Sequence, residues 1–522
     1  MERVFKVGSM ADSLRIYVPI MAMQRVLGLG RVLIFAYLLA EAQYGLWALG
    51  SMIFAIGAPI VTLGSNHGLV RYVSFYEARG QLQRFYRRIR WSLVGLCAAL
   101  GLLGFLGSDI LTRLVIVSRS QVEAGISYAD QLHVCWVAVA NCVLLALYTN
   151  TVSVMYGLRA YRMVSTVEVL FSILFTIIAV GALLMEPTGL MLLVAHLISL
   201  ALAIAAATAM LEACLKRMAE TAPAITSEAG DVSPPPAIDA ADGRREKPLM
   251  RRVIGFGVVA LIGSVLWQGT QYISFWITSY QKGKSVGGVF FVFLRLGQPG
   301  LLLANAAWSV IFTHVAQRWE NLDRPGAMFR LETAYKAVCL ATMTVATGLY
   351  LLLPLWVRLL PAEYRQGQEF FGGILMYFQV VCHLSVAMIL AKLHERPVMI
   401  VLSAVAGGAA NALLCAWWLA RGASEGGWLS PAWAAGVGIY VGAGLVGVAY
   451  LLLARVRLSV GTWLMMAVPG LLILPTWALA GAWAAVLTAA AFTGLLFNHG
   501  QKQLLIGYVR KLGWWFKRDR PC

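Results

Sequence analysis

Long apolar runs separated by short polar connections make up most of the chain. A window of about 19 residues, the length needed to cross a bilayer, finds fourteen such runs. They lie near residues 14–39, 44–66, 91–107, 132–156, 163–185, 188–212, 253–279, 286–313, 334–360, 367–391, 397–420, 431–454, 459–475 and 477–498. A helix satisfies its own backbone hydrogen bonds inside a bilayer. The pattern therefore predicts an all-α polytopic membrane protein with about 14 transmembrane helices.

Composition supports the same class of protein. Hydrophobic residues make up 60% of the chain and charged residues 13%, against about 45–50% and 25% in soluble domains. The 8 cysteines fall in apolar runs or on predicted cytoplasmic segments, without a Cys-x-x-Cys pair. We therefore predict no disulfide, no metal site and no cofactor. The first apolar run is too long for a cleavable signal peptide and contains arginines.

Lysine and arginine are distributed unequally between the predicted sides of the membrane. The odd-numbered connections between the predicted helices hold seven of the 42 basic residues. The N-terminus, the even-numbered connections and the C-terminus together hold thirty, and the other five lie within helices. This bias predicts that both termini lie in the cytoplasm. The net charge of +18 then reflects topology and attraction to anionic lipids, and we expect no nucleic-acid partner.

A polar segment divides the chain into two parts. Residues 216–248 are rich in proline and alanine and contain no aromatic residue, a composition typical of a disordered linker. We assign residues 214–250 to a disordered cytoplasmic linker. Six predicted helices precede it, in residues 1–213, and eight follow it.

The two parts share a local motif. The second predicted helix contains Gly57-Ala58-Pro59, and the eighth contains Gly297-Gln298-Pro299. Each motif lies near mid-span and is followed by a basic cytoplasmic loop. Proline bends a helix, and glycine allows another backbone to approach closely. Matched interruptions are typical of transporters built from repeats, so Gly57, Pro59, Gly297 and Pro299 are candidate hinges.

Arginines lie inside two of the apolar runs. Arg25 and Arg31 lie in the first predicted helix, and Arg295 lies in the eighth. A guanidinium stays charged, at a cost of at least about 2.5–3.5 kcal/mol in a bilayer, unless it faces a wet cavity or an anion. At 1.5 Å per residue, Arg25 is roughly 18 Å from the cytoplasmic boundary and Arg295 roughly 13 Å from the outer one. The two therefore lie at nearly one level, one in each half.

Further polar residues accompany these arginines. Gln24 shares a helix face with Arg31, Gln298 follows Arg295 by one turn, and the seventh helix carries Gln268 and Gln271. The candidate substrate-binding residues are Arg15, Gln24, Arg25, Arg31, Gln268, Gln271, Arg295 and Gln298. Arg15 is equally well explained by snorkelling to the cytoplasmic surface, and the glutamines by interhelical hydrogen bonds. A net positive cavity suits a phosphate or pyrophosphate, which guanidinium groups bind with paired hydrogen bonds.

Two stretches resemble a known family. Residues 39–49, Leu-Ala-Glu-Ala-Gln-Tyr-Gly-Leu-Trp-Ala-Leu, and residues 63–73, with Leu63-Gly64 and Gly68-Leu-Val-Arg71, precede a basic loop. This pattern resembles the oligosaccharide flippases of the MOP exporter superfamily, the Wzx-type polysaccharide-biosynthesis transporters. The likeness is strongest over residues 10–90 and weaker over residues 250–320.

The resemblance implies an architecture and a function. It implies two six-helix lobes related as repeats, the second over residues 251–455, with helices 13 and 14 and a basic tail in residues 456–522. It implies transport of an undecaprenyl-pyrophosphate-linked oligosaccharide to the outer leaflet of the bacterial inner membrane, by alternating access through a cationic cavity. Relatives place cavity arginines in helices 1 and 8, where Arg25, Arg31 and Arg295 match. Some also place charged residues in helix 2, which here has none before Arg71.

Three other functions are consistent with parts of the sequence. A cation-coupled multidrug exporter of the same superfamily would favour carboxylates in the cavity, whereas the first helix offers basic charge. A membrane glycan polymerase or ligase would carry a large extracytoplasmic loop, and the longest such connection here is residues 108–131. A scaffold would leave the membrane arginines unexplained. We expect a transporter, not an enzyme, whose partners are the lipid-linked substrate, membrane lipids and other polysaccharide assembly proteins.

Overall fold

The computed structural model confirms an all-α polytopic fold. It describes residues 10–66, 69, 73, 76, 82–117, 126–158, 160–221, 249–320, 322–394, 396, 398–420 and 431–507. This described part contains helices and no strand. Ten of its helices are long and apolar enough to cross a membrane, and two shorter apolar segments, Val460–Ile473 and Thr476–Phe492, follow them. The number of 14 spans stays a prediction.

The described residues of the first half form seven α-helices and a short π-helix. They are α2 (Met10–Leu38), α3 (Glu41–Thr62), α5 (Leu82–Leu106), α6 (Ser108–Leu111), the π-helix η1 (Thr112–Ile116), α7 (Tyr128–Gly157), α8 (Tyr161–Met185) and α9 (Gly189–Thr221). Local sequence sets several of the ends. Ser127 and Asp130 form a reciprocal capping box at the start of α7, and α3 ends where Leu63 and Gly64 take left-handed backbone angles.

The second half begins after the predicted linker. Its helices are α10 (Leu249–Lys282), α11 (Lys284–Gly297), α12 (Pro299–Glu320), α13 (Arg324–Leu351), α14 (Leu353–Arg358), η3 (Ala362–Gly367), α15 (Gln368–Leu393), α16 (Val398–Ala420), α17 (Pro431–Leu453), α18 (Val460–Ala467), η4 (Val468–Ile473) and α19 (Thr476–Phe492). The linker assignment was partly wrong, because residues 214–221 continue α9. These residues are mostly good helix formers. Residues 222–248 and the tail from residue 508 lie outside the described part.

The same pairs of helices pack together in the two halves. In the first half α2 packs on α8, α3 and α5 on α7, and α9 on both α7 and α8. In the second half α10 packs on α16, α11, α12 and α13 on α15, and α17 on both α15 and α16. The glycines of the two Gly-x-Pro motifs lie against the equivalent helix of each half, α7 in the first and α15 in the second. A Cβ atom on Gly57 would lie 2.6 Å from Cys142 of α7, and one on Gly297 would lie 2.8 Å from Ile374 of α15.

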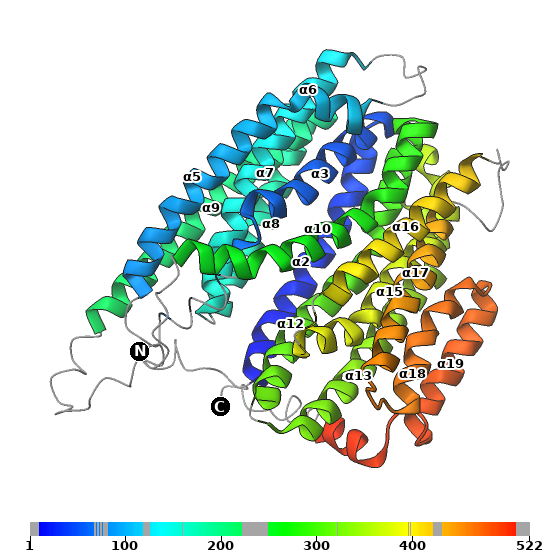
Figure 1. Cartoon of the computed structure of the whole chain (residues 1–522). Coiled ribbons are helices and arrows are strands. Elements are labelled where there is room, and N and C mark those ends of the chain that lie inside the picture. Colours follow the sequence, from blue (N-terminus) through cyan, green and yellow to red (C-terminus); the bar gives the residue numbers. More distant parts are fainter. Residues whose placement is uncertain are drawn as a thin grey trace, which may run out of the picture.

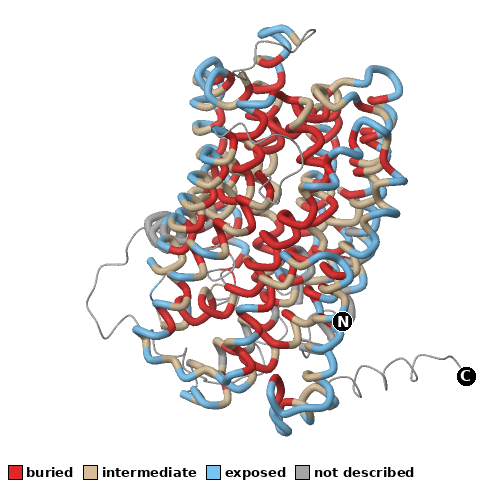
Figure 2. The backbone as a smooth tube through the Cα atoms, turned by 90° about the vertical axis from the view of Figure 1, so that its right-hand side faces the viewer, coloured by how far each residue is buried: buried red, intermediate tan, exposed pale blue. Residues whose placement is uncertain are grey.

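The two halves lie side by side and share an apolar core. In Figure 1, α5 to α9 lie on one side, α12 to α19 on the other, and α2, α3 and α10 between them. Figure 2 shows that buried positions concentrate along the middle of the molecule, with exposed positions around the outside. One apolar cluster joins both halves through α3, α7, α11 and α15. This arrangement brings the predicted arginine-bearing helices, α2 and α11, to the central region.

A buried polar cluster attaches the last helices to α13. The Oε2 atom of Glu332 accepts hydrogen bonds from the backbone and hydroxyl of Ser459 and from the hydroxyl of Thr462. Lys336 lies 3.8 Å from Glu332 and donates to Gln501 at 3.1 Å. Lys336 is only 1% exposed, so this ion pair is structural. Unpaired polar groups at such depth are costly.

Replacing Glu332 by alanine is expected to loosen the C-terminal helices. The substitution leaves Lys336 buried beside an apolar residue, and removing one partner of a buried ion pair typically costs about 3–5 kcal/mol. Thermal unfolding of the purified protein in detergent should show a clearly lowered Tm. Glu369→Ala, which removes an exposed carboxylate from α15, is the matched control. Equal Tm values for both variants would contradict a structural role for the cluster.

Candidate functional site

Helices α3 and α11 bring the two halves into direct backbone contact at one end of the molecule. A Cβ atom on Gly45 would lie 2.0 Å from the carbonyl oxygen of Lys284, and one on Gly288 would lie 2.1 Å from that of Glu41. Only glycine allows backbones to approach so closely. The hydroxyl of Tyr364 also donates to the carbonyl of Leu39 at 2.9 Å. The halves are therefore closed against each other at this end, which the Lys and Arg bias predicts to be extracytoplasmic.

Four buried aromatic rings, one each from α8, α2, α3 and α11, form a row next to the glycine crossing. Phe175 of α8 lies 5.8 Å from Phe35 of α2, and Phe35 lies 6.0 Å from Trp47 of α3. Trp47 in turn lies 5.5 Å from Phe291 of α11. All three pairs meet edge to face, the favoured geometry for aromatic contacts. The row therefore crosses from the first half of the molecule to the second.

A guanidinium group lies over the ring at each end of this row. The guanidinium carbon of Arg31 lies 4.7 Å from the centre of the Phe175 ring, and that of Arg295 lies 4.7 Å from the centre of the Phe291 ring. Both arginines are partly buried, where a cation over an aromatic ring gains more than it does in water. Arg31 also donates to the carbonyl of Ser172 at 3.4 Å. The aromatic row thus holds one permanent positive charge from each half.

The side chain of Arg295 is oriented by its own helix end. Its Nη1 atom donates to Oε1 of Gln298 at 3.0 Å. Gln298 is the residue at which α11 stops and α12 starts, between Gly297 and Pro299. Within the described part of the chain, no carboxylate lies within ion-pair distance of Arg295. The helix break therefore positions a guanidinium that keeps its charge available for an anion.

Two further buried polar groups lie beside the aromatic row. The ring of Tyr44 lies 5.1 Å from Trp47, and the imidazole of His196 lies 5.0 Å from Phe175. His196 contacts Oδ1 of Asn141 through Nδ1 at 2.7 Å. The Tyr44 hydroxyl is buried and makes no hydrogen bond to any described residue. A tyrosine hydroxyl can both donate and accept a hydrogen bond.

The structure describes only some of the other sequence-predicted residues. Gln24 donates to the carbonyl of Glu168 on α8 at 3.3 Å, so Gln24 and Arg31 both face α8, consistent with their seven-residue spacing. Gln268 and Gln271 are partly buried on α10. The side chains of Arg15 and Arg25 lie outside the described part of the structure. The roles of all these residues as substrate ligands stay predictions.

The candidate hinges differ between the two halves. Helix α3 continues through Gly57 and Pro59 to Thr62, whereas the equivalent helix of the second half is interrupted at Gln298. Pro59 lies within the last turn of α3, where the lost hydrogen bond is close to the helix end. Pro299 starts α12 after a full helix of 14 residues. A hinge role for both motifs stays a prediction.

Sequence reasoning missed the aromatic residues of the site. Phe35, Trp47, Phe175 and Phe291 occur in apolar runs, where an aromatic side chain is most simply interpreted as core. Trp47 and Tyr44 fall in residues 39–49, the stretch that carries the family resemblance. Arg31 and Ser172, however, are 141 residues apart in sequence. A single sequence gives no signal for such a pairing.

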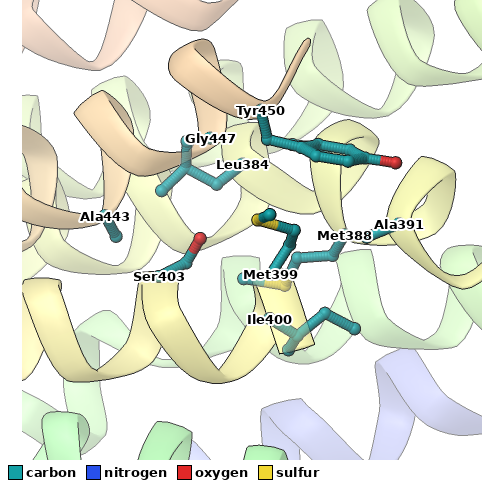
Figure 3. A pocket seen from close by; sticks show the side chains of 10 residues that line it. Leu384, Met388, Ala391, Met399, Ile400, Ser403, Ala443, Gly447 and Tyr450 are labelled. Atoms are coloured by element: carbon teal, nitrogen blue, oxygen red, sulfur yellow. The ribbon is translucent and has the colours of Figure 1, made fainter. Parts of the chain in front are cut away.

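A small space elsewhere in the second half does not have the volume of a binding site. Figure 3 shows it between α15, α16 and α17, lined mainly by apolar side chains that include Leu384, Met388 and Met399. Its volume is about 10 Å³, the space of a single water molecule at most. Among the described residues, no group of three or more His, Cys, Asp or Glu side chains could hold a metal ion.

Comparison with known proteins identifies the fold. No family model matches the chain, and no curated protein matches it. An inward-facing multidrug resistance MATE transporter of the MOP superfamily is similar in structure, with a TM-score of 0.59 at 12% identity, over 83% of this chain and 96% of that one. The lipid II flippase MurJ, in an inward closed conformation, gives 0.58 at 14% identity, over 96% of this chain and 99% of MurJ.

A third solved structure extends the comparison. A MOP superfamily transporter from Pyrococcus furiosus, described as having a binding pocket of reverse polarity, gives a TM-score of 0.54 at 13% identity, over 86% of this chain and 96% of that one. These identities are too low to transfer a substrate. The structural neighbours are transporters, and the arrangement of helices is common to all of them. The chain therefore has the fold of the MOP superfamily transporters.

Proposed function

We propose that this protein is a flippase that moves a lipid-linked oligosaccharide across the bacterial inner membrane, with pyrophosphate as the group it grips. The observation that carries the proposal is the pair of guanidinium groups, Arg31 and Arg295, one from each half, on a continuous aromatic row. Arginine binds phosphate oxygens with two parallel hydrogen bonds. The sequence resemblance to Wzx-type flippases and the fold shared with MurJ support the same substrate class.

The proposed mechanism is alternating access. The headgroup enters from the cytoplasmic side while the glycine crossing of α3 and α11 closes the outer end. Arg31, Arg295 and the predicted partner Arg25 replace water around the pyrophosphate, and the lipid chain stays in the bilayer. Separation of the halves at the glycine crossing then exposes the headgroup outside. Each negative charge that leaves a negative cytoplasm gains about 2.3 kcal/mol per 100 mV, so the membrane potential favours export.

A cation-coupled multidrug exporter is the second candidate. The structural similarity to a MATE transporter supports it, because the TM-score of 0.59 with that transporter is as high as the 0.58 with MurJ. A binding site for cationic drugs, however, would need uncompensated negative charge. Of the membrane carboxylates described, Glu332 is fully engaged with Ser459 and Thr462, and Glu168 of α8 accepts a hydrogen bond from the hydroxyl of Tyr156 at 3.4 Å. The charge of the central region therefore favours the flippase.

Reconstitution distinguishes the two candidates. Purified protein in liposomes should increase the rate at which a fluorescent undecaprenyl-pyrophosphate oligosaccharide exchanges between leaflets, measured by dithionite quenching of the outer leaflet. Transport of a cationic dye under an imposed proton or sodium gradient should stay at the level of empty liposomes. Dye transport without movement of the lipid-linked glycan would contradict the proposed function and support the drug exporter.

A further inference from the structure

A hollow with three arginines lies at the end of the second half where α12 meets α13, α15 meets α16 and α17 meets α18. It has a volume of about 600 Å³, within the range of pockets that hold a ligand. Arg324 is the first residue of α13, Arg396 lies between α15 and α16, and Arg455 lies between α17 and α18. This hollow is separate from the region around Arg31 and Arg295.

The arginines of the hollow carry uncompensated charge. Within the described part of the chain, Arg324, Arg396 and Arg455 form no ion pair, whereas the nearby Arg318 is paired with Asp323 at 2.6 Å. No described residue lining the hollow is acidic. The guanidinium of Arg324 lies 5.4 Å from the ring of Trp319, which forms part of the wall. Three unpaired guanidinium groups around one space make a strong site for an anion.

The histidine in the wall responds to this positive charge. His394 follows the last residue of α15 and its Nδ1 atom lies 2.8 Å from the hydroxyl of Tyr450. The pKa of His394 is lowered, first by burial and then by the charges of Arg396 and Arg324. Its ring also lies 5.2 Å from Trp319. The positive charges of Arg396 and Arg324 therefore both act on the wall of the hollow.

The hollow lies at the level where the helices leave the membrane. The candidate spans of α15 and α17 end at Leu393 and Leu453, both of which line it. Leu322 and Leu453 are each 78% exposed, which is expected for apolar side chains that face acyl chains. Two lining residues, Leu322 and Arg455, have positive φ angles of 64° and 51°. Non-glycine residues adopt such angles at a cost, and they concentrate at ligand sites.

We propose that this hollow binds the phosphate headgroup of an anionic phospholipid from the surrounding leaflet. The Lys and Arg bias predicts that leaflet to be cytoplasmic, where anionic lipids are bound by basic pockets between helices. The arginines would hold the phosphate, Trp319 would contact the glycerol region, and the exposed leucines would border the acyl chains. One lipid bound this way would join the ends of α12, α15 and α17 and restrain their relative movement.

Lipid binding to purified protein tests this proposal. Native mass spectrometry in a neutral detergent should show bound phosphatidylglycerol in excess over phosphatidylcholine when both are added at equal concentration. The double variant R324Q/R396Q should weaken the binding of phosphatidylglycerol at least tenfold. Both positions are exposed, so the fold should be retained, and a gel-filtration profile unchanged from wild type checks this.

A neighbouring arginine provides the matched control. Arg457 is exposed and two residues from Arg455, but it does not line the hollow, so R457Q should bind phosphatidylglycerol as the wild type does. Equal losses in R457Q and R324Q/R396Q would overturn the proposal, since general surface charge would then explain binding. Competition by millimolar inorganic phosphate that removes the lipid completely would also overturn it, in favour of a free anion as the ligand.

Discussion

Replacing Arg295 by alanine is expected to reduce the flipping of a lipid-linked pyrophosphate about 10- to 100-fold. A charge-assisted hydrogen bond contributes about 1.5–3 kcal/mol, and a tenfold change corresponds to 1.4 kcal/mol. Arg295 keeps its charge available because its only described side-chain hydrogen bond is to Gln298. Arg31→Ala should give a loss of similar size, since that guanidinium lies at the opposite end of the same aromatic row. The leaflet-exchange assay in liposomes measures both variants.

Two further variants show that the loss is specific to the guanidinium. Arg295→Lys keeps the charge but not the paired hydrogen bonds, so its rate should fall between those of the wild type and Arg295→Ala. Arg162→Ala removes an exposed arginine from the start of α8 and should leave the rate unchanged. Wild-type flipping by Arg295→Ala, with the protein folded and inserted, would rule out Arg295 as a ligand.

Replacing Gly45 by valine is expected to prevent the predicted outer end from closing and to lower transport at least tenfold. The added Cβ would lie 2.0 Å from the carbonyl oxygen of Lys284 and 2.8 Å from its carbonyl carbon. A helix backbone cannot give way to a side chain as a flexible neighbour can. The closed state therefore becomes unfavourable, and the population shifts to the state in which α3 and α11 are apart.

Labelling from outside the cell reports this shift. Ala48 is fully buried on α3, so a cysteine introduced there in a cysteine-free background should react slowly with a membrane-impermeant maleimide. The same cysteine should react several times faster when Gly45 is replaced by valine. Gly181→Val is the control, because a Cβ atom at Gly181 meets nothing within 4 Å. Unchanged labelling and unchanged transport in Gly45→Val would contradict a gate at this crossing.

The positions of the helices could be predicted from the sequence because each apolar run is long. Their ends could not, since helices continue into polar residues that still favour helix. Helix α13 starts at Arg324, ahead of the apolar run predicted from residue 334, because Asp323 caps it through Gly326. The run over residues 334–360 also proved to be two helices, with a break at Leu352 before Pro354.

The arginines of the candidate site stand out in the sequence, and its aromatic residues do not. Arginine is so costly in a bilayer that Arg31 and Arg295 stand out in apolar runs. A phenylalanine in the same run costs nothing, so Phe175 and Phe291 give no sign that a guanidinium lies over each of them. The glycine crossing was also missed, because Gly45 and Gly288 lie in different halves and glycine is common in membrane helices.

A double-mutant cycle on substrate affinity tests the central claim most directly, that Arg31 and Arg295 hold one anion between the two halves. Affinity for a lipid-linked pyrophosphate would be measured for the wild type, Arg31→Gln, Arg295→Gln and the double variant. If both guanidinium groups bind the same pyrophosphate, the two losses should deviate from additivity by more than about 0.5 kcal/mol. Unchanged affinity in both single variants, or losses that simply add, would contradict a shared anion site.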